Sequence, residues 1–108
     1  MMAGGMCDGE YRLGGKTVYV QKGEARLKDG RLAGSTLTMD RAVRNVIDML
    51  DISIPQAVSM AAENPAGLLR IRDRGRIAKG CMADLVIFDD DINIDMVIKS
   101  GQMRINNL

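Results

Sequence analysis

The 108-residue sequence contains no histidine and no tryptophan, and its aromatic residues are limited to Tyr11, Tyr19 and Phe88. Histidine is the commonest acid or base near neutral pH and the commonest metal ligand. If the chain belongs to an enzyme, its catalytic machinery therefore lies elsewhere. The sequence has nine methionines, which predicts a core of aliphatic and thioether side chains that specifies shape loosely.

Cysteine is scarce and long apolar runs are absent. Cys7 and Cys81 form no Cys-x-x-Cys pair, which argues against a disulfide framework or a zinc knuckle, and we expect Cys81 to be a small buried residue. No apolar run approaches the roughly 20 residues that a membrane span needs, and the first residues lack the pattern of a secretory signal. A net charge of +1, with opposite charges interspersed, predicts no nucleic-acid partner and no membrane partner. We therefore expect a cytoplasmic location.

The first part of the chain has the composition of loops and turns. With 46% hydrophobic and 27% charged residues, the chain suffices for one modest globular domain. Residues 1–15 hold five glycines, which predicts an irregular loop that ends in a Gly14-Gly15 turn. Residues 16–28 predict a β-hairpin with strands at 17–20 and 24–27, because the Lys22-Gly23 step permits the positive backbone angles of a tight turn.

An amphipathic helix is predicted next, over about residues 36–50. Apolar residues from Leu37 to Leu50 recur every three or four positions, with charged residues between them. Ser35 or Thr36 would cap this helix, and Asp40 would lie near the positive end of its dipole.

A second helix and further strands complete the pattern. Ser53 and Gln56 have capping-box spacing and Pro55 falls in the first turn, which predicts a helix over 54–63. Pro65 is expected to end or kink it. The stretch "ADLVIFD" predicts one strand, and "MVIKSGQMRIN" predicts two strands joined at a Ser-Gly turn. The expected fold class is α+β, or a piece of a larger architecture.

Four stretches carry a resemblance to a known family. They are "MMAGGMCDGEYRLGG", "KTVYVQKGEARLKDGRLAGSTLTMDRAVRN", "ENPAGLL" and "GRIAKGCMADLVIFD". Together they resemble the C-terminal part of the N-acetylglucosamine-6-phosphate deacetylases, within the amidohydrolase superfamily. The "G-x-I-x-x-G-x-x-A-D-L" turn is shared by many amidohydrolases, whereas "LAGSTLTMDRAVRN" after a hairpin, with "GMCDGEYRLGG" before it, points to the deacetylases.

The resemblance implies a parent enzyme with a metal-bearing (β/α)8 barrel and a small β-sandwich. A complete barrel needs about 250 residues, so this chain corresponds to a piece of one. Residues 1–75 correspond to the end of the barrel, and residues 76–108 correspond to the C-terminal strands of the sandwich. The expected fragment is α+β, with a β-hairpin, two to three helices and a small antiparallel β segment.

The family's chemistry maps only in part onto this sequence. In the parent, a divalent metal, zinc or similar, activates water to hydrolyse N-acetylglucosamine 6-phosphate to glucosamine 6-phosphate and acetate. The resemblance places the catalytic aspartate immediately upstream of Met1 and the metal ligands further upstream, so we expect no catalytic residue, no metal ligand and no cofactor in this chain. Asp8 lies past the catalytic position. What carries over is substrate binding through the backbone of Leu32, Ala33 and Gly34, helped by close approach at glycine and by the N–H groups of a following helix.

Several features have a plainer structural interpretation. The Gly34-Ser35 step is, from spacing alone, a helix cap. The alternating arginines 70, 72, 74 and 76 are either a phosphate-binding row or a solvated edge, and the solvated edge is favoured. Residues 89–91, three aspartates, suggest a Mg²⁺ or Ca²⁺ site but lack the spacing of a calcium loop, which favours a strand-end turn.

Three functional hypotheses remain from the sequence. The first is a piece of an N-acetylglucosamine-6-phosphate deacetylase that is inactive alone. The second is a non-enzymatic module that self-associates, as a dimer or higher homo-oligomer, through apolar residues of the first predicted helix. These residues are Met39, Val43, Val46, Ile47 and Leu50. The third is a piece of another amidohydrolase, dihydroorotase-like or adenine-deaminase-like.

Overall fold

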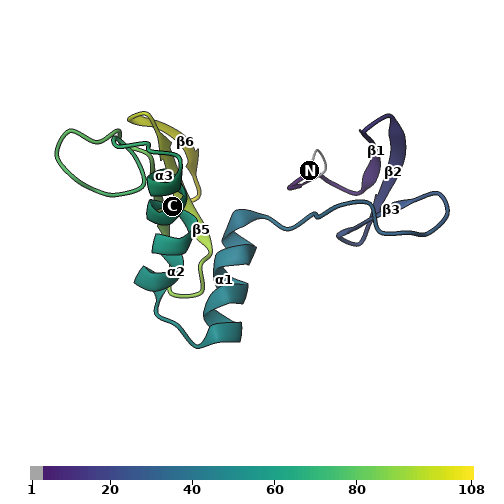
Figure 1. Ribbon diagram of the computed structural model, residues 1–108, viewed down its shortest axis with the longest axis horizontal. Helices are drawn as coiled ribbons and strands as arrows, with labels where there is room; N and C mark the ends of the chain where they lie inside the picture. Colours follow the sequence, from purple (N-terminus) through teal and green to yellow (C-terminus); the bar gives the residue numbers. More distant parts are fainter. Residues whose placement is uncertain (1–3) are drawn as a thin grey trace. The chain divides into compact units, whose positions relative to one another are not determined.

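A computed structural model describes residues 4–108, which separate into two compact units that meet in sequence between Thr38 and Met39 (Figure 1). The first unit is a three-stranded antiparallel sheet in the order β1-β2-β3. Its strands are β1 (Gly9–Leu13), β2 (Lys16–Gln21) and β3 (Glu24–Leu27). Within residues 4–108, no helix combines the length and the apolar character that crossing a membrane requires.

The predicted hairpin is confirmed, and β1 extends it into a sheet. Lys22 and Gly23 link β2 to β3 with φ values of 51° and 77°, as a tight turn requires. Val18 and Val20 point to one face, where they form the core of the sheet with Ala25 and Ala33. Val18 has no exposed surface at all.

The prediction of an irregular loop over residues 1–15 was wrong for residues 9–13, which form β1. Residues 1–3 of the predicted loop lie outside the described part of the chain. Gly14 and Gly15 have φ values of 55° and 79° and make a two-residue turn that folds β1 back onto β2. Tyr11 pairs with Val18 and packs against the core. The glycine-rich composition concealed this strand, because the glycines turn the chain rather than leave it irregular.

The second unit contains three helices and a second antiparallel sheet, in the order β4-β5-β6. The helices are α1 (Met39–Leu50), α2 (Ile54–Ala61) and α3 (Glu63–Leu68), and the strands are β4 (Leu85–Phe88), β5 (Ile94–Lys99) and β6 (Gln102–Asn106). Helices α1 and α2 lie side by side (Figure 1). The three predicted C-terminal strands are confirmed, and so is the α+β class.

The first helix begins three residues later than its predicted start. Ser35 Oγ accepts a hydrogen bond from the Leu37 N–H at 3.0 Å, and Thr36 Oγ1 donates to the Gly23 carbonyl oxygen. Both side chains therefore stabilise the loop that follows β3, and neither caps the helix. Asp40 lies in the first turn of α1, as predicted.

The second helix starts as predicted but ends earlier. Ser53 is its N-cap residue, and the Ser53 N–H donates to Gln56 Oε1 at 2.9 Å. Helix α2 ends at Ala61, and Ala62 leaves the helical conformation with φ −125° and ψ −68°. Pro65 lies in the first turn of the separate helix α3, where proline is tolerated. It lacks the N–H that a continuous helix would need to bond the Ala61 carbonyl oxygen, so the break before it agrees with the expected effect of Pro65.

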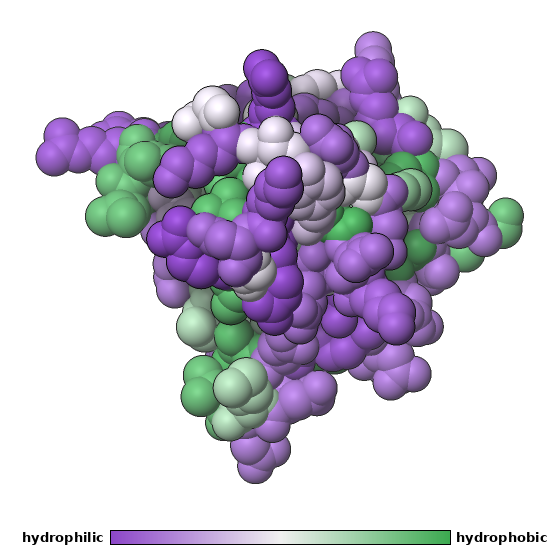
Figure 2. Space-filling view, turned by 90° about the vertical axis from the view of Figure 1, so that its right-hand side faces the viewer, coloured by the Kyte–Doolittle hydropathy of each residue, from purple (hydrophilic) through white to green (hydrophobic). Residues whose placement is uncertain are grey.

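The correspondence of these elements to the end of a barrel and to sandwich strands stays a prediction, as does the expected boundary between residues 75 and 76. Apolar side chains reach the surface of the described chain in many places, and Figure 2 shows such patches between hydrophilic side chains. Helix α1 has no buried residue, although one side of it is apolar. Six apolar side chains are buried within the described residues, which is a small core for a chain of this length.

Two glycines of the second unit allow a matched stability test. Gly75 and Gly80 have similar φ values of 84° and 88°. A Cβ atom added at Gly75 would lie 2.9 Å from both the Ala62 carbonyl oxygen and the Ala66 Cβ, whereas a Cβ atom added at Gly80 would have no atom within 4 Å. We expect Gly80→Ala to cost about 1 to 2 kcal/mol from the left-handed backbone alone. Gly75→Ala should cost about 1 to 3 kcal/mol more, from overpacking. Urea unfolding of both variants measures the difference, and equal costs would contradict the close packing at Gly75.

Candidate functional site

Leu32, Ala33 and Gly34 lie on the segment that returns along β3. The Ala33 N–H donates to the Ala25 carbonyl oxygen at 2.8 Å, and Leu32 forms an isolated β-bridge with Arg26. The segment therefore follows β3 as an extra, short strand. Ala33 is buried in the core of the sheet, whereas the Leu32 side chain is 69% exposed.

The turn before this segment is closed by main-chain bonds. The Gly30 N–H donates to the Leu27 carbonyl oxygen at 2.9 Å, and the Leu27 N–H donates to the Arg31 carbonyl oxygen at 2.8 Å. Asp29 Oδ2 accepts from Nε and Nη2 of Arg31 at 2.9 and 2.7 Å, and this pairing lowers the pKa of the Asp29 carboxyl group. Residues 27–31 thus form a closed turn that delivers the chain to Leu32.

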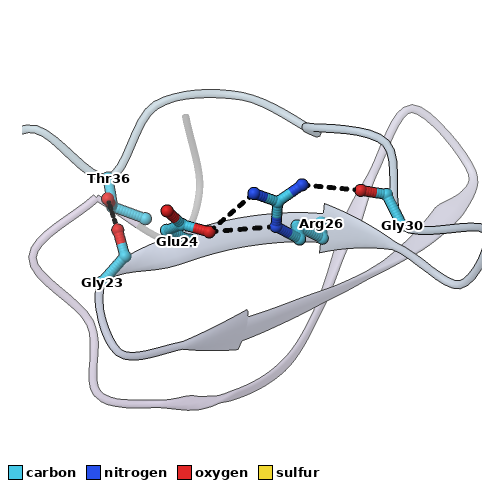
Figure 3. Close-up of polar contacts among 5 residues, drawn as sticks. All are labelled: Gly23, Glu24, Arg26, Gly30 and Thr36. Carbon is cyan, nitrogen blue, oxygen red and sulfur yellow. Dashed lines mark hydrogen bonds and ion pairs between the residues drawn. The ribbon is translucent and has the colours of Figure 1, made fainter.

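Arg26 joins the sheet to this turn (Figure 3). Its Nε and Nη2 atoms donate to Glu24 Oε2 at 3.0 and 2.8 Å, and its Nη1 atom donates to the Gly30 carbonyl oxygen at 2.8 Å. Tyr19 of β2 is the residue paired directly with Arg26 of β3. Glu24 and Arg26 were not among the predicted site residues. Their spacing of two on a predicted strand, which places both on one face, is the signal that would have indicated them.

The geometry changes the physical reason for placing substrate at Leu32, Ala33 and Gly34. The Ala33 N–H is already bonded to Ala25, so it is not a ready donor to a ligand. Helix α1 begins at Met39 and not at about residue 36, so its free N–H groups do not come directly after Gly34. Gly34 has a φ of 106°, a conformation that side-chain-bearing residues rarely adopt, which explains glycine at this position. The expected close approach of a ligand to Gly34 stays a prediction.

A surface cavity of about 610 Å³ lies on the face of the hairpin that carries Arg26. It is lined by residues of β2, β3 and the two turns that flank β3: Tyr19, Gln21, Lys22, Glu24, Arg26, Leu27, Lys28 and Gly30. The lining contains three cationic side chains and one carboxylate, together with one aromatic ring. Such a mixture suits a small polar anion better than an apolar ligand.

The three consecutive aspartates at 89–91 form a turn, as favoured from the sequence. Asp89 Oδ1 accepts from the N–H groups of Asp91 and Asn93 at 3.0 and 2.8 Å, and Asp89 Oδ2 accepts from the Asn93 side-chain amide at 2.8 Å. The side-chain and main-chain hydrogen bonds from Asn93 lower the pKa of Asp89. Arg44 of α1 holds the same loop by donating to the Asp91 carbonyl oxygen at 2.7 Å.

The described residues do not fit a metal centre of the amidohydrolase kind. The sequence has no histidine, and within residues 4–108 no three Cys, Asp or Glu side chains come together as ligands. No catalytic step can therefore be derived from this chain through a metal.

The remaining sequence candidates are structural or exposed. The four arginines at 70, 72, 74 and 76 are exposed, as expected of a solvated edge, and Arg74 pairs with Asp84 at 3.0 Å. Asp84 of the "ADL" stretch also accepts the Ser100 N–H at 2.7 Å, which ties the loop to the turn between β5 and β6. Both cysteines are free; Cys7 is exposed, and Cys81 is half-buried rather than buried.

Comparison with known proteins gives a consistent result over nearly the whole chain. The sequence profile described as Amidohydrolase family matches residues 31–102. The N-acetylglucosamine-6-phosphate deacetylase of Lysinibacillus sphaericus is 41% identical over 105 residues, which are 97% of this chain and 27% of that protein. The N-acetylgalactosamine-6-phosphate deacetylase of Escherichia coli O157:H7 is 36% identical over 104 residues, which are 95% of this chain and 28% of that protein.

Solved structures agree with these relatives. The Thermotoga maritima N-acetylglucosamine-6-phosphate deacetylase matches with a TM-score of 0.80 and 44% identity, over 94% of this chain and 28% of that one. A variant of the Mycobacterium smegmatis enzyme, solved in complex with N-acetyl-D-glucosamine-6-phosphate, matches with a TM-score of 0.81 and 35% identity, over 98% of this chain and 29% of that one. The chain thus spans between 27% and 29% of the length of the relatives named here.

The Asp89 turn generates a pH prediction. Because hydrogen bonds to its carboxylate lower the pKa of Asp89 in the folded chain, they contribute stability above the unfolded-state pKa, and this contribution is lost as pH falls through the folded-state pKa. We expect Asn93→Ala to raise the Asp89 pKa toward its ordinary value, without reaching it, since the main-chain donors remain. Carboxyl-carbon NMR titration measures the shift, with exposed Asn64→Ala as control. An Asp89 pKa that is identical in wild type and Asn93→Ala would contradict the hydrogen-bond cause.

Proposed function

The chain belongs to the Amidohydrolase family, and on that premise we propose that it forms one part of an enzyme that hydrolyses N-acetylglucosamine 6-phosphate to glucosamine 6-phosphate and acetate. The observation that carries the proposal is the 41% to 44% identity to N-acetylglucosamine-6-phosphate deacetylases over at least 94% of the chain. The relative from Escherichia coli O157:H7 is named for the galactosamine epimer, which differs from the glucosamine sugar in the configuration of the 4-hydroxyl. A comparison of the two sugar phosphates as substrates would therefore test recognition of that hydroxyl.

Within such an enzyme, Leu32, Ala33 and Gly34 would position the substrate and take no part in proton transfer. The support is the attachment of this segment to β3 on one side and to Arg26 through Gly30 on the other. A backbone held in this way loses little conformational entropy when a ligand binds. The divalent metal and the catalytic aspartate would come from the part of the enzyme that this chain does not match.

The alternatives from the sequence differ in their support. None of the relatives named above is a dihydroorotase or an adenine deaminase, so that alternative has no observation in its favour. Self-association is compatible with the proposed descent, and the exposed apolar residues of α1 support it. Met39 and Leu50 are 67% and 58% exposed. The cytoplasmic location stays a prediction.

We expect the chain to bind the substrate without turning it over. Titration of the labelled chain with N-acetylglucosamine 6-phosphate and Zn²⁺ should shift the Leu32 and Gly34 amide resonances saturably, whereas the Gly101 amide in the second unit serves as the unaffected control. No glucosamine 6-phosphate or acetate should form, since the sequence has no histidine to complete a metal centre. Turnover that survives repurification would contradict the absence of catalytic residues. A lack of any response at Leu32 and Gly34 would contradict their contact with substrate.

We also propose that the chain self-associates through α1. A helix that carries apolar residues but buries none of them is expected to cover that face with a second copy. Sedimentation at micromolar concentration should show a dimer or larger species for the wild type and a monomer for Leu50→Glu, which changes an exposed apolar residue. Arg41→Glu, at an exposed polar position of the same helix, is the matched control and should sediment like the wild type. A wild-type monomer at every concentration would overturn the proposal.

A further inference from the structure

Ile92 holds a backbone conformation that its side chain disfavours. Its φ is 60°, in the left-handed region, where a β-branched residue is a genuine outlier. The Ile92 side chain is nevertheless only 3% exposed, while the other residues of the loop 89–93 between β4 and β5 are exposed. This loop therefore buries one apolar side chain and carries local backbone strain at the same residue.

Arg44 of α1 holds the residues on both sides of Ile92. Its Nε atom donates to the Asp91 carbonyl oxygen at 2.7 Å, and its Nη2 atom donates to Asn93 Oδ1 at 3.2 Å. The loop also closes on itself, because the Ile92 N–H donates to the Asp89 carbonyl oxygen at 2.9 Å. The two bonds from Arg44 thus fasten the strained loop to a helix that lies far from it in the sequence.

Ile92 also lines two cavities of the second unit. One cavity, of about 350 Å³, lies among α1, α2 and the second sheet, and its lining is apolar apart from Asp40. The other, of about 420 Å³, is lined mainly by polar and charged side chains, among them Arg44 and Asp48. Within residues 4–108, Ile92 is the one residue that lines both, so withdrawal of its side chain would join the apolar cavity to the polar one.

We propose that residues 89–93 form a latch that opens while the rest of the second unit stays folded, and that Arg44 controls how often it opens. In the closed state, the burial of Ile92 and the two Arg44 bonds oppose the backbone strain. In the open state the strain is released, and the exposed residues of the loop have no burial to lose. The latch does not depend on the proposed enzymatic function of the chain.

Native-state hydrogen exchange of the 108-residue chain tests the latch. In the wild type, the protection factor of the Ile92 amide should change little at low urea concentration, as local opening requires, whereas the most protected amides of the central strand β5 should report global unfolding. Arg44→Ala should lower the Ile92 protection factor about tenfold and leave those of β5 within about twofold. Arg41→Ala, at an exposed position of the same helix, is the matched control and should change neither. An equal loss of protection at Ile92 and in β5 would overturn local opening.

Two further measurements separate strain from packing. Ile92→Leu keeps the apolar volume but removes the branch at Cβ, so the protection factor at residue 92 should rise about threefold. A soluble paramagnetic agent should relax the Ile92 methyl signals more in Arg44→Ala than in the wild type, while the Ala57 methyl group, 2% exposed, serves as the unaffected control. Lower protection in Ile92→Leu would overturn the role of strain. Identical Ile92 protection and methyl relaxation in wild type and Arg44→Ala would overturn the latch.

Discussion

The hydrogen bond from the Ala33 N–H to the Ala25 carbonyl oxygen decides the shape of the first unit. It brings the segment after β3 back alongside the sheet and buries the Ala33 methyl group with Val18 and Val20. Once Ala33 is in place, Leu32 faces outward and Gly34 turns the chain away with a φ that glycine readily adopts. The position of the candidate substrate segment depends on this return of the chain.

Side-chain contacts extend the same fastening. Arg26 reaches the Gly30 carbonyl oxygen and Thr36 reaches the Gly23 carbonyl oxygen, so the loop is attached to the hairpin at both of its ends. Exposed ion pairs such as Glu24 with Arg26 contribute little to stability by themselves. Their importance here is geometric, because the bonds to Glu24 and Gly30 together fix the Arg26 guanidinium group between β3 and the turn.

Burial is the second constraint on the chain. The described residues bury few apolar side chains completely, and the strands of the second sheet expose Val86 and Ile87, which point to opposite faces. A sheet with apolar residues on both faces is typical of the interior of a larger structure. This agrees with relatives of which the chain spans little more than a quarter, and it is the physical reason to expect a partner surface.

Local patterns predicted most of the secondary structure. Turn residues and period-two alternation predicted β2 and β3, apolar periodicity predicted α1, the capping box predicted the start of α2, and β-branched runs predicted β4 to β6. The errors have specific causes. Strand β1 was concealed by the glycines around it, and Ser35 and Thr36 were assigned to a helix cap because their hydrogen bonds to Leu37 and Gly23 are not visible in spacing.

The sequence by itself determined the family, through motifs that run along the chain. It also showed that the chain has no histidine to build an amidohydrolase metal centre. It also determined the segment Leu32 to Gly34 as the candidate for substrate contact, a role that stays a prediction. Only the tertiary structure decided that Ala33 is bonded and buried, and that the Arg26 side chain is bonded to the Gly30 carbonyl oxygen. The reason is physical. A motif depends only on the order of residues, whereas a hydrogen bond forms between backbone and side-chain groups that meet only after the chain has turned back on itself.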